Sequence, residues 1–332
     1  MDKPVIVLTM GDPAGIGPEI VARVLAQETA RAHCRPLVIG EPRVFATACE
    51  MLRLNLQVRT VEGLADCRFA PNEIEVLRPP GLDIDRVPWG QLDPAWGEAA
   101  ALCLRHACTL AGTGHVQGVV SAPLNKEAFH LAGYPHRDEL EYMAEITGSD
   151  QTFIVGLMGT LWTVAVTEHV PFRSIVDLLT KERITRYIGH MQTVLQRTGS
   201  ARGRIGVAAL NAHGGEGGTC GREEIEVIAP AIEEARAQGI AATGPIPADT
   251  IFVRALGGEF DGVVCLYHDQ ANIARKLHAP RTGATFFMGL PFACGTTAHG
   301  TAFDKAGQGI ADPGSMETAL RYTVALSGAP RP

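Results

Sequence analysis

The sequence lacks the features that would direct it to a membrane, out of the cell or onto nucleic acid. It contains no run of about 18 apolar residues, so no membrane-spanning helix is predicted. Its first residues lack the basic and apolar regions of a secretion signal, and we therefore expect a cytoplasmic protein. Its 332 residues include 29 Lys+Arg against 36 Asp+Glu, a net charge of −7, whereas proteins that coat nucleic acid need a basic face. No nucleic-acid or membrane partner is predicted.

Several familiar motifs of catalysis and cofactor binding are also absent. The chain has no G-x-G-x-x-G, G-x-x-x-x-G-K-[ST], H-E-x-x-H or G-x-S-x-G. The standard motifs for dinucleotide binding, nucleoside triphosphate hydrolysis, zinc proteolysis and α/β-hydrolase chemistry are thus missing. Eight cysteines are present, but no two have the C-x-x-C spacing of zinc or redox sites, and we interpret them as reduced, mostly buried thiols. Any metal site must use other ligands.

Short apolar runs alternate with amphipathic segments along the whole chain. The apolar runs predict strands at 5–9, 36–39, 56–61, 74–77, 118–121, 153–155, 161–166, 204–210, 262–266 and 284–287. The amphipathic segments predict helices at 18–27, 42–51, 97–111, 126–131, 139–147, 175–197, 223–238, 248–254, 301–306 and 315–326. Such alternation is typical of a largely parallel sheet covered by helices. The predicted fold class is α/β.

Polar and glycine-rich segments follow four of the predicted strands. They span residues 10–19, 121–126, 211–218 and 267–270. Ligands of open α/β sheets bind beyond the carboxyl ends of the strands, and glycine lets the backbone approach them closely. We therefore expect the functional site at these strand ends.

Three histidines, His169, His213 and His268, each follow a predicted strand. Three imidazoles on neighbouring strand ends can converge on one divalent cation and leave positions open for a substrate. Asp249 and Asp269 are candidates to orient the rings as hydrogen-bond acceptors. Imidazole donors alone do not choose between zinc, cobalt, manganese and iron. Each histidine taken singly is as well explained as a hydrogen-bonded structural residue.

A second group of polar residues precedes the helix predicted at 139–147. Asp138 is placed to cap this helix, and Glu139 suits the positive end of its dipole. His136 and Arg137 lie outside the helix and are therefore free to contact a ligand.

Together these segments resemble the 4-hydroxythreonine-4-phosphate dehydrogenase family of vitamin B6 synthesis. The matching segments are TMGDPAGIGPE at 9–19, APLNK at 122–126, NAHGGEGG at 211–218, GPIPADT at 244–250, YHDQ at 267–270, GLPF at 289–292 and HGTA at 299–302. They extend from the first strand to the last helices, and the set is highly specific for the superfamily.

The resemblance implies a two-domain α/β/α fold of the isocitrate and isopropylmalate dehydrogenase type. A cleft would lie between the domains, and a homodimer would share its active site. The first domain would comprise residues 1–125 and 290–332. The second would comprise residues 126–289 and carry the metal ligands.

The resemblance also implies an activity. The family uses NAD or NADP to oxidise a hydroxyl β to a carboxylate, with loss of CO₂, and needs a divalent metal (zinc, cobalt, manganese or magnesium). Its metal ligands correspond to His169, His213 and His268. Its substrate contacts correspond to His136 and Lys276. Catalytic roles are expected for Lys276, Asp249 and Asp269, and the substrate would be a small anionic hydroxy acid.

Three positions depart from the family pattern and are further candidates for substrate contact. Arg137 stands where the family has threonine, Thr285 where it has asparagine and Cys294 where it has arginine. Loss of that arginine removes a bidentate partner for phosphate. The substrate therefore stays open between 4-hydroxythreonine 4-phosphate, a cis-dihydrodiol carboxylate of the terephthalate type, and a threonate or erythronate phosphate. A metal-dependent hydrolase or lyase that uses no nicotinamide is the alternative of another class.

Overall fold

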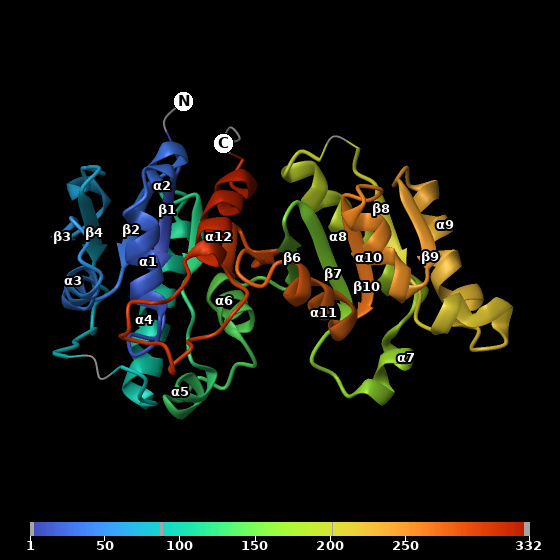
Figure 1. Ribbon diagram of the computed structural model, residues 1–332, viewed down its shortest axis with the longest axis horizontal. Helices are drawn as coiled ribbons and strands as arrows, with labels where there is room; N and C mark the ends of the chain where they lie inside the picture. Colours follow the sequence, from blue (N-terminus) through green and yellow to red (C-terminus); the bar gives the residue numbers. More distant parts are fainter. Residues whose placement is uncertain (1–2, 87–88, 201, 329–332) are drawn as a thin grey trace. The chain divides into compact units, whose positions relative to one another are not determined.

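The computed structural model describes residues 3–86, 89–200 and 202–328 and divides the chain into two compact units. The first unit is Met1–Phe153 together with Ala284–Pro332, and the second is Ile154–Gly283. Each unit contains strands covered by helices (Figure 1), which confirms the predicted α/β class. Within the described ranges, no helix is long and apolar enough to cross a membrane.

The strands of the first unit are ordered β3-β4-β2-β1-β5-β12-β11. Their bounds are β1 Val5–Thr9, β2 Arg35–Ile39, β3 Gln57–Val61, β4 Glu73–Leu77, β5 Gly118–Ser121, β11 Ala284–Met288 and β12 Ala293–Thr297. Neighbours are parallel except β11 and β12, which form an antiparallel pair. The carboxyl ends of β1 and β5 therefore meet at one edge, where the first two polar segments begin.

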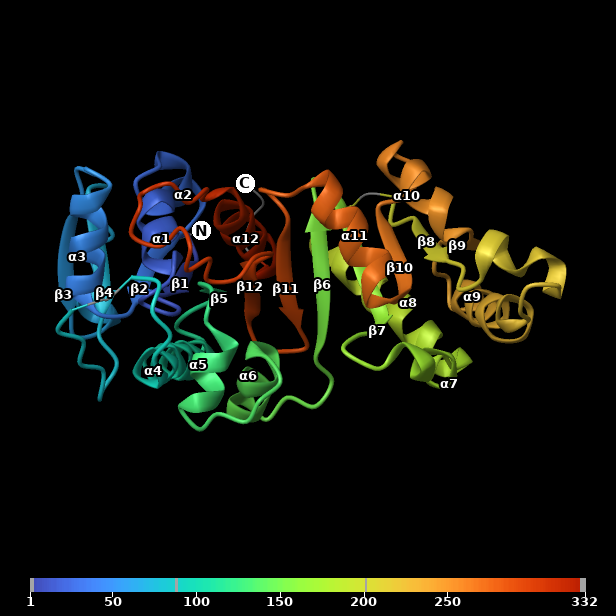
Figure 2. The same cartoon turned by 60° about the horizontal axis from the view of Figure 1, so that its bottom comes forward.

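Helices cover both faces of these strands. They are α1 Gly17–Leu25, α2 Glu28–His33, α3 Pro42–Met51, α4 Pro94–Gly112, α5 Lys126–Leu131, α6 Glu139–Thr147 and α12 Gly314–Leu326. Figure 2 shows α1, α2 and α12 on one face and α4, α5 and α6 on the other. The central strand β1 is buried along its whole length.

The unit boundaries differ from those predicted at 125/126 and 289/290. The helices α5 and α6 pack on α4 and therefore stay with the first unit. Strand β11 pairs with β12, which moves the second boundary to Gly283 and Ala284. The first unit is thus built from two separate segments of the chain and the second from one continuous segment.

The second unit has the strand order β6-β7-β10-β8-β9. The strands are β6 Phe153–Met158, β7 Leu161–Thr167, β8 Ile205–Ala208, β9 Ala242–Ile246 and β10 Gly262–Tyr267. The helices are α7 Ile175–Leu178, α8 Lys181–Arg197, α9 Ala229–Ala237, α10 Ala248–Leu256 and α11 His268–His278. β6 and β7 are antiparallel, and β10 is parallel to both β7 and β8. Apolar residues of β10 and α10, such as Val263, Cys265 and Ile251, form part of its core.

Side-chain caps set several helix starts where the sequence predicts them. The carboxylate of Asp138 accepts a hydrogen bond from Glu141 N at 2.9 Å, which confirms the predicted cap of α6. The amide oxygen of Asn125 accepts from Ala128 N at 3.0 Å at the start of α5. All eight cysteines are free and six are buried, as predicted.

The helix predicted at 301–306 is wrong, because these residues form successive turns. Ala302 has a φ of 42°, and Thr301 O accepts a hydrogen bond from Ile16 N at 3.0 Å. The segment therefore takes its shape from the loop after β1. The sequence also gave no signal for α2, β9 or β12.

The contact between α4 and α5 generates a stability test. A Cβ at Gly97 would lie 2.1 Å from the carbonyl oxygen of Ala128, so α5 would have to shift. We expect Gly97→Ala to lower the free energy of unfolding by about 1–3 kcal/mol, measured by chemical denaturation. The control is Gly112→Ala in the same helix, where nothing lies within 4 Å and the added methyl should be neutral or stabilising by up to about 1 kcal/mol. Equal effects of the two substitutions would contradict the described packing.

Candidate functional site

Asp12 lies at the carboxyl end of β1 and is fully buried. Its backbone N donates to Pro123 O at 2.9 Å, and its Oδ1 accepts from Ala14 N at 2.9 Å. Its Oδ2 is buried without a hydrogen-bond partner. Burial raises the pKa of this carboxyl to about 6, although the hydrogen bond from Ala14 N lowers it. The neighbouring Gly11 has a φ of 68°, and a Cβ there would lie 2.4 Å from Pro123 O, so the segments after β1 and β5 require glycine where they meet.

His136 and Arg137 lie just before α6, in the first unit. The His136 Nε2 is 2.7 Å from Glu145 Oε2, and its ring packs edge-on against Tyr142 with 5.0 Å between centroids. The Arg137 guanidinium donates to Asp138 at 3.2 Å but is 63% exposed, so most of its donors face solvent. The Arg137 side chain is therefore accessible to solvent, and its contact with a ligand stays a prediction.

Glu139, the first residue of α6, is half-buried, but its carboxyl is buried, which the sequence did not indicate. Its Oε2 lies buried without a hydrogen-bond partner. Burial raises the pKa of its carboxyl to about 7, although a hydrogen bond with Ser121 and the charge of Lys126 oppose the shift. Its position at the start of a helix explains why the residue is acidic. It does not explain why the carboxyl is buried, because the segment after β5, which is distant in sequence, covers it.

His169, His213 and His268 all lie in the second unit, each after a different strand. His169 follows β7, and His268 begins α11 directly after β10; their ring centroids are 5.6 Å apart. Both line a hollow of about 180 Å³ together with Glu168, Tyr267 and other residues near the ends of these strands. His213 lies in the turn Ala212–Gly218 after β8. The predicted placement at strand ends is therefore observed for each histidine.

Backbone strain accompanies two of these histidines. Six of the described non-glycine residues have a positive φ, and His169 at 36° and His213 at 51° are among them. Such conformations cost free energy and persist where the surrounding structure enforces them, which is common at functional sites. Local backbone preference therefore does not explain why these positions carry histidine.

Carboxylates hold two of the three imidazoles. Asp269 Oδ1 lies 2.7 Å from His268 Nδ1, and Glu216 Oε1 lies 2.8 Å from His213 Nδ1. An ionised carboxylate only accepts, so Nδ1 carries the proton and Nε2 of the neutral ring keeps its lone pair. This is the usual pairing of a metal-binding histidine. It was predicted for Asp269, whereas Glu216 was missed.

The donor chemistry fits a divalent transition metal, although the side chains do not form a closed ligand set. No group of three or more His, Cys, Asp and Glu side chains among the described residues is close enough to hold a metal ion. His169 and His268 lie side by side, and His213 would have to approach them. The metal site therefore stays a prediction.

The remaining predicted residues lie in different environments. Lys276 is exposed on α11, and Thr285 is half-buried on β11. Cys294 is fully buried on β12, with its sulfur 3.9 Å from that of Met143. This thiol is therefore not accessible to a substrate in the structure.

The parallel α/β units and the polar strand-end residues define an enzyme of the α/β class with a candidate metal site. The family model described as pyridoxal phosphate biosynthetic protein PdxA matches residues 32–323, and the chain belongs to this family. It is accordingly a dehydrogenase, an oxidoreductase that acts on CH–OH groups.

Curated relatives and solved structures agree with this assignment. The D-threonate 4-phosphate dehydrogenase of Salmonella typhimurium is 37% identical, covering 98% of this chain and 100% of the relative. A 4-hydroxythreonine-4-phosphate dehydrogenase structure from Klebsiella pneumoniae is 36% identical with a TM-score of 0.87, covering 98% of both chains. A terephthalate 1,2-cis-dihydrodiol dehydrogenase structure from Burkholderia xenovorans is 26% identical with a TM-score of 0.67, covering 97% of this chain and 98% of that one.

The buried carboxyl of Asp12 generates a test of pH dependence. Its pKa is about 6 in the folded protein against 3.8 when exposed, so between these values the folded state keeps a proton that the unfolded state releases. Its contribution to stability is therefore full below about pH 4 and is lost as the pH rises through 6. We expect Asp12→Asn to be stabilised relative to wild type by on the order of 2–3 kcal/mol more at pH 7 than at pH 4, measured by denaturation at both values.

The control for this test is Asp83→Asn, at a carboxylate that is 80% exposed, which should leave the pH profile of stability unchanged. If Asp12→Asn and the wild type showed the same dependence of stability on pH, the burial of an ionisable Asp12 would be contradicted.

Proposed function

We propose that the chain oxidises a hydroxyl β to a carboxylate in a small phosphorylated hydroxy acid, with hydride transfer to NAD or NADP and loss of CO₂. The dehydrogenase class follows from the family. The observation that carries the metal-dependent part is the trio of strand-end histidines in one unit, two of which leave Nε2 free. Imidazole donors favour zinc or cobalt over magnesium.

In this proposal His169, His213 and His268 hold the ion through ring nitrogens. A bound divalent ion would act as a Lewis acid that lowers the pKa of the substrate hydroxyl and stabilises negative charge on its oxygen. Asp269 fixes the tautomer and orientation of His268. Asp249 adds negative charge near His213.

Lys276 is the proposed side chain for the anionic end of the substrate and for proton transfer. It lies on α11, the helix that begins with His268, a little over two turns further on. His268 and Lys276 are therefore about 12 Å apart along the helix axis and about 80° apart around it. An exposed ammonium with three donors can hold a carboxylate or phosphate.

The first unit supplies the other proposed substrate contacts. The ring of His136 is fixed by Glu145 and Tyr142, so it offers a rigid polar contact. Arg137 presents a planar guanidinium that matches two oxygens of a phosphate or carboxylate. Thr285 would add a hydroxyl, which both donates and accepts.

A phosphorylated substrate is favoured over an aromatic dihydrodiol. Relatives named for 4-hydroxythreonine 4-phosphate and for D-threonate 4-phosphate are similar to this chain at 36% and 37% identity, whereas the dihydrodiol dehydrogenase reaches 26%. Arg137 supplies a cation that a phosphate requires. A cytoplasmic homodimer with a shared active site is part of the same proposal.

The metal role is tested by His268→Ala. We expect the variant to lose bound metal, measured by elemental analysis, and to reduce by more than a hundredfold the rate of NADH or NADPH formation with D-threonate 4-phosphate. The control is His278→Ala, which removes an exposed imidazole from the other end of the same helix and should change neither quantity.

Two results would contradict this account. Full activity after exhaustive chelation would exclude the metal role. Metal-dependent turnover of the phosphorylated acids without nicotinamide reduction would favour the hydrolase or lyase alternative. Faster turnover of terephthalate dihydrodiol than of either phosphorylated acid would instead favour the dihydrodiol alternative.

Arg137 is tested by its own substitution. We expect Arg137→Ala to raise KM for the phosphorylated substrate by about tenfold or more, because a bidentate charged contact is lost. Arg137→Lys should recover part of the loss. The control is Arg222→Ala, which removes a similarly exposed arginine that pairs with Glu226 and should leave KM unchanged. An unchanged KM in Arg137→Ala would exclude the proposed contact.

A further inference from the structure

A hollow of about 800 Å³ lies in the first unit at the amino ends of its strands. Lys3 precedes β1, Arg35 begins β2 and Asn72 precedes β4, and all three line it. Asp12 and Lys126 follow the opposite, carboxyl ends of β1 and β5. The hollow therefore lies at the opposite end of these strands from Asp12 and Lys126.

Positive charge dominates the lining of this hollow. Four of the lining residues are cationic, namely Lys3, Arg31, Arg35 and Arg53, against one carboxylate, Glu28. In the described part of the chain, none of the four cations forms an ion pair with a carboxylate. The hollow thus holds cationic groups without bound counter-charge.

Backbone carbonyls, rather than acids, hold these cations in place. The Arg31 guanidinium donates to Glu73 O at 2.5 Å and to Leu25 O. Lys3 Nζ donates to Arg31 O at 2.8 Å, and Arg35 Nε donates to Lys3 O at 2.9 Å. Partial burial lowers the pKa of Arg31, so its charged form lacks part of its hydration. A bound anion would restore that lost stabilisation.

Arg53 occupies a position that normally belongs to glycine. It follows α3 with a φ of 54°, its N donates to Glu50 O at 3.0 Å, and Leu54 N donates to Cys49 O at 2.9 Å. These two bonds define the Schellman ending of a helix, in which glycine is preferred at the left-handed residue. A glycine would fit here with less strain, so folding does not account for an arginine whose side chain lines the hollow.

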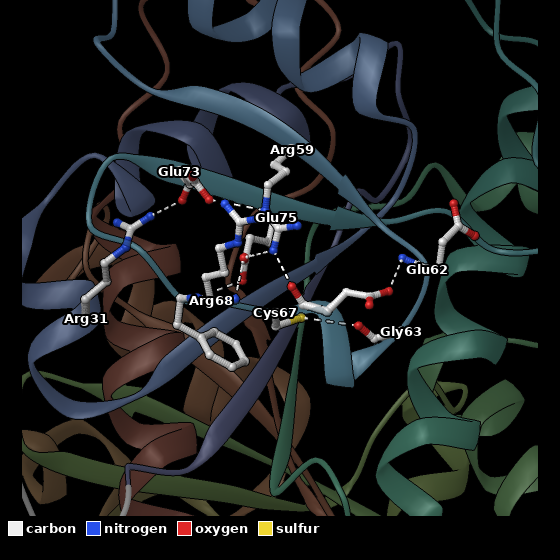
Figure 3. A network of polar contacts seen from close by, with 10 residues as sticks. Arg31, Arg59, Glu62, Gly63, Cys67, Arg68, Glu73 and Glu75 are labelled. Carbon is white, nitrogen blue, oxygen red and sulfur yellow. Dashed lines mark hydrogen bonds and ion pairs between the residues drawn. The ribbon is translucent and has the colours of Figure 1, made fainter.

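Phe69 is a second strained residue in the wall, with a φ of 52°. The buried Glu75 carboxylate accepts a hydrogen bond from Arg68 N at 2.7 Å (Figure 3). It accepts a second one from Phe69 N at 3.0 Å. Arg59 pairs with both Glu75 and Glu73, and neither acid forms an ion pair with a cation of the hollow, although the charge of Glu75 still favours the charged form of Arg31. The Arg35 guanidinium lies 5.4 Å from the Phe69 ring centroid. The network therefore fixes an aromatic face beside an arginine.

We propose that this hollow is a second ligand site that binds a small phosphate-bearing organic anion. Its volume lies within the range of sites for small organic ligands. Lys3, Arg31, Arg35 and Arg53 would bind the phosphate oxygens, since guanidinium groups match them bidentately. The amides of Gln27, Asn55 and Asn72, which also line the hollow, would bind the hydroxyl or carbonyl groups of the ligand.

The test is titration calorimetry of the full chain with ADP and with pyrophosphate, in the absence of added metal. We expect at least one probe to bind. Arg53→Gly should weaken that binding at least threefold and yet raise the melting temperature by about 1–3 °C, because glycine relieves the strain at the helix end. A substitution that weakens binding and raises the melting temperature identifies a residue that serves a ligand and not the stability of the fold.

Arg31→Met should weaken binding of the probe at least tenfold. If Arg31→Met does not fold, the result for Arg53→Gly decides whether the hollow is the binding site. The control Arg254→Met removes an exposed arginine paired with Glu259 and should leave binding unchanged. Arg137→Ala, at the candidate active site, should also leave it unchanged.

The proposal would be overturned if neither ADP nor pyrophosphate bound to the wild-type chain at 10 mM, because binding weaker than about 10 mM is too weak to carry a function. Loss of binding in Arg137→Ala with full binding in Arg53→Gly would also overturn it, because the anion would then occupy the active site. Neither result would bear on the proposed dehydrogenase reaction.

Discussion

The candidate metal site depends on the parallel pairing of β10 with both β7 and β8. The registers Tyr267 to Thr167 and Val264 to Val207 bring the carboxyl ends of three strands to one edge. Each strand then continues into a segment that contains one of the three histidines. Because side chains at such an edge can converge without distorting the sheet, the topology rather than any local motif selects the position of the chemistry.

Around this constraint the chain tolerates features that would otherwise destabilise it. His169 and His213 adopt a left-handed backbone, and the carboxyls of Asp12 and Glu139 are buried with raised pKa values. Each of these unfavourable features lies after the end of a strand or at the start of a helix. Departures from local preference at the ends of strands are typical of functional sites. Arg53 and Phe69 also have a positive φ, and both line the cationic hollow where we propose a second ligand site.

The sequence predicts those parts of the fold whose signals are local. The side chains of Asn125 and Asp138 define the starts of α5 and α6 to the residue. The strand at 293–297, ACGTT, has little apolar content and exists because β5 and β11 pair with it. The same division applies to the site: histidines after strands could be recognised, whereas the burial of Glu139 and Cys294 depends on distant residues.

We propose that one divalent ion is held by histidines of three neighbouring strand ends. The most direct measurement is an anomalous difference map from crystals of the full chain grown with cobalt or zinc. The account predicts one strong peak bonded to ring nitrogens of His169, His213 and His268. A peak at cysteine sulfurs, or none at these histidines with the metal present in excess, would contradict it.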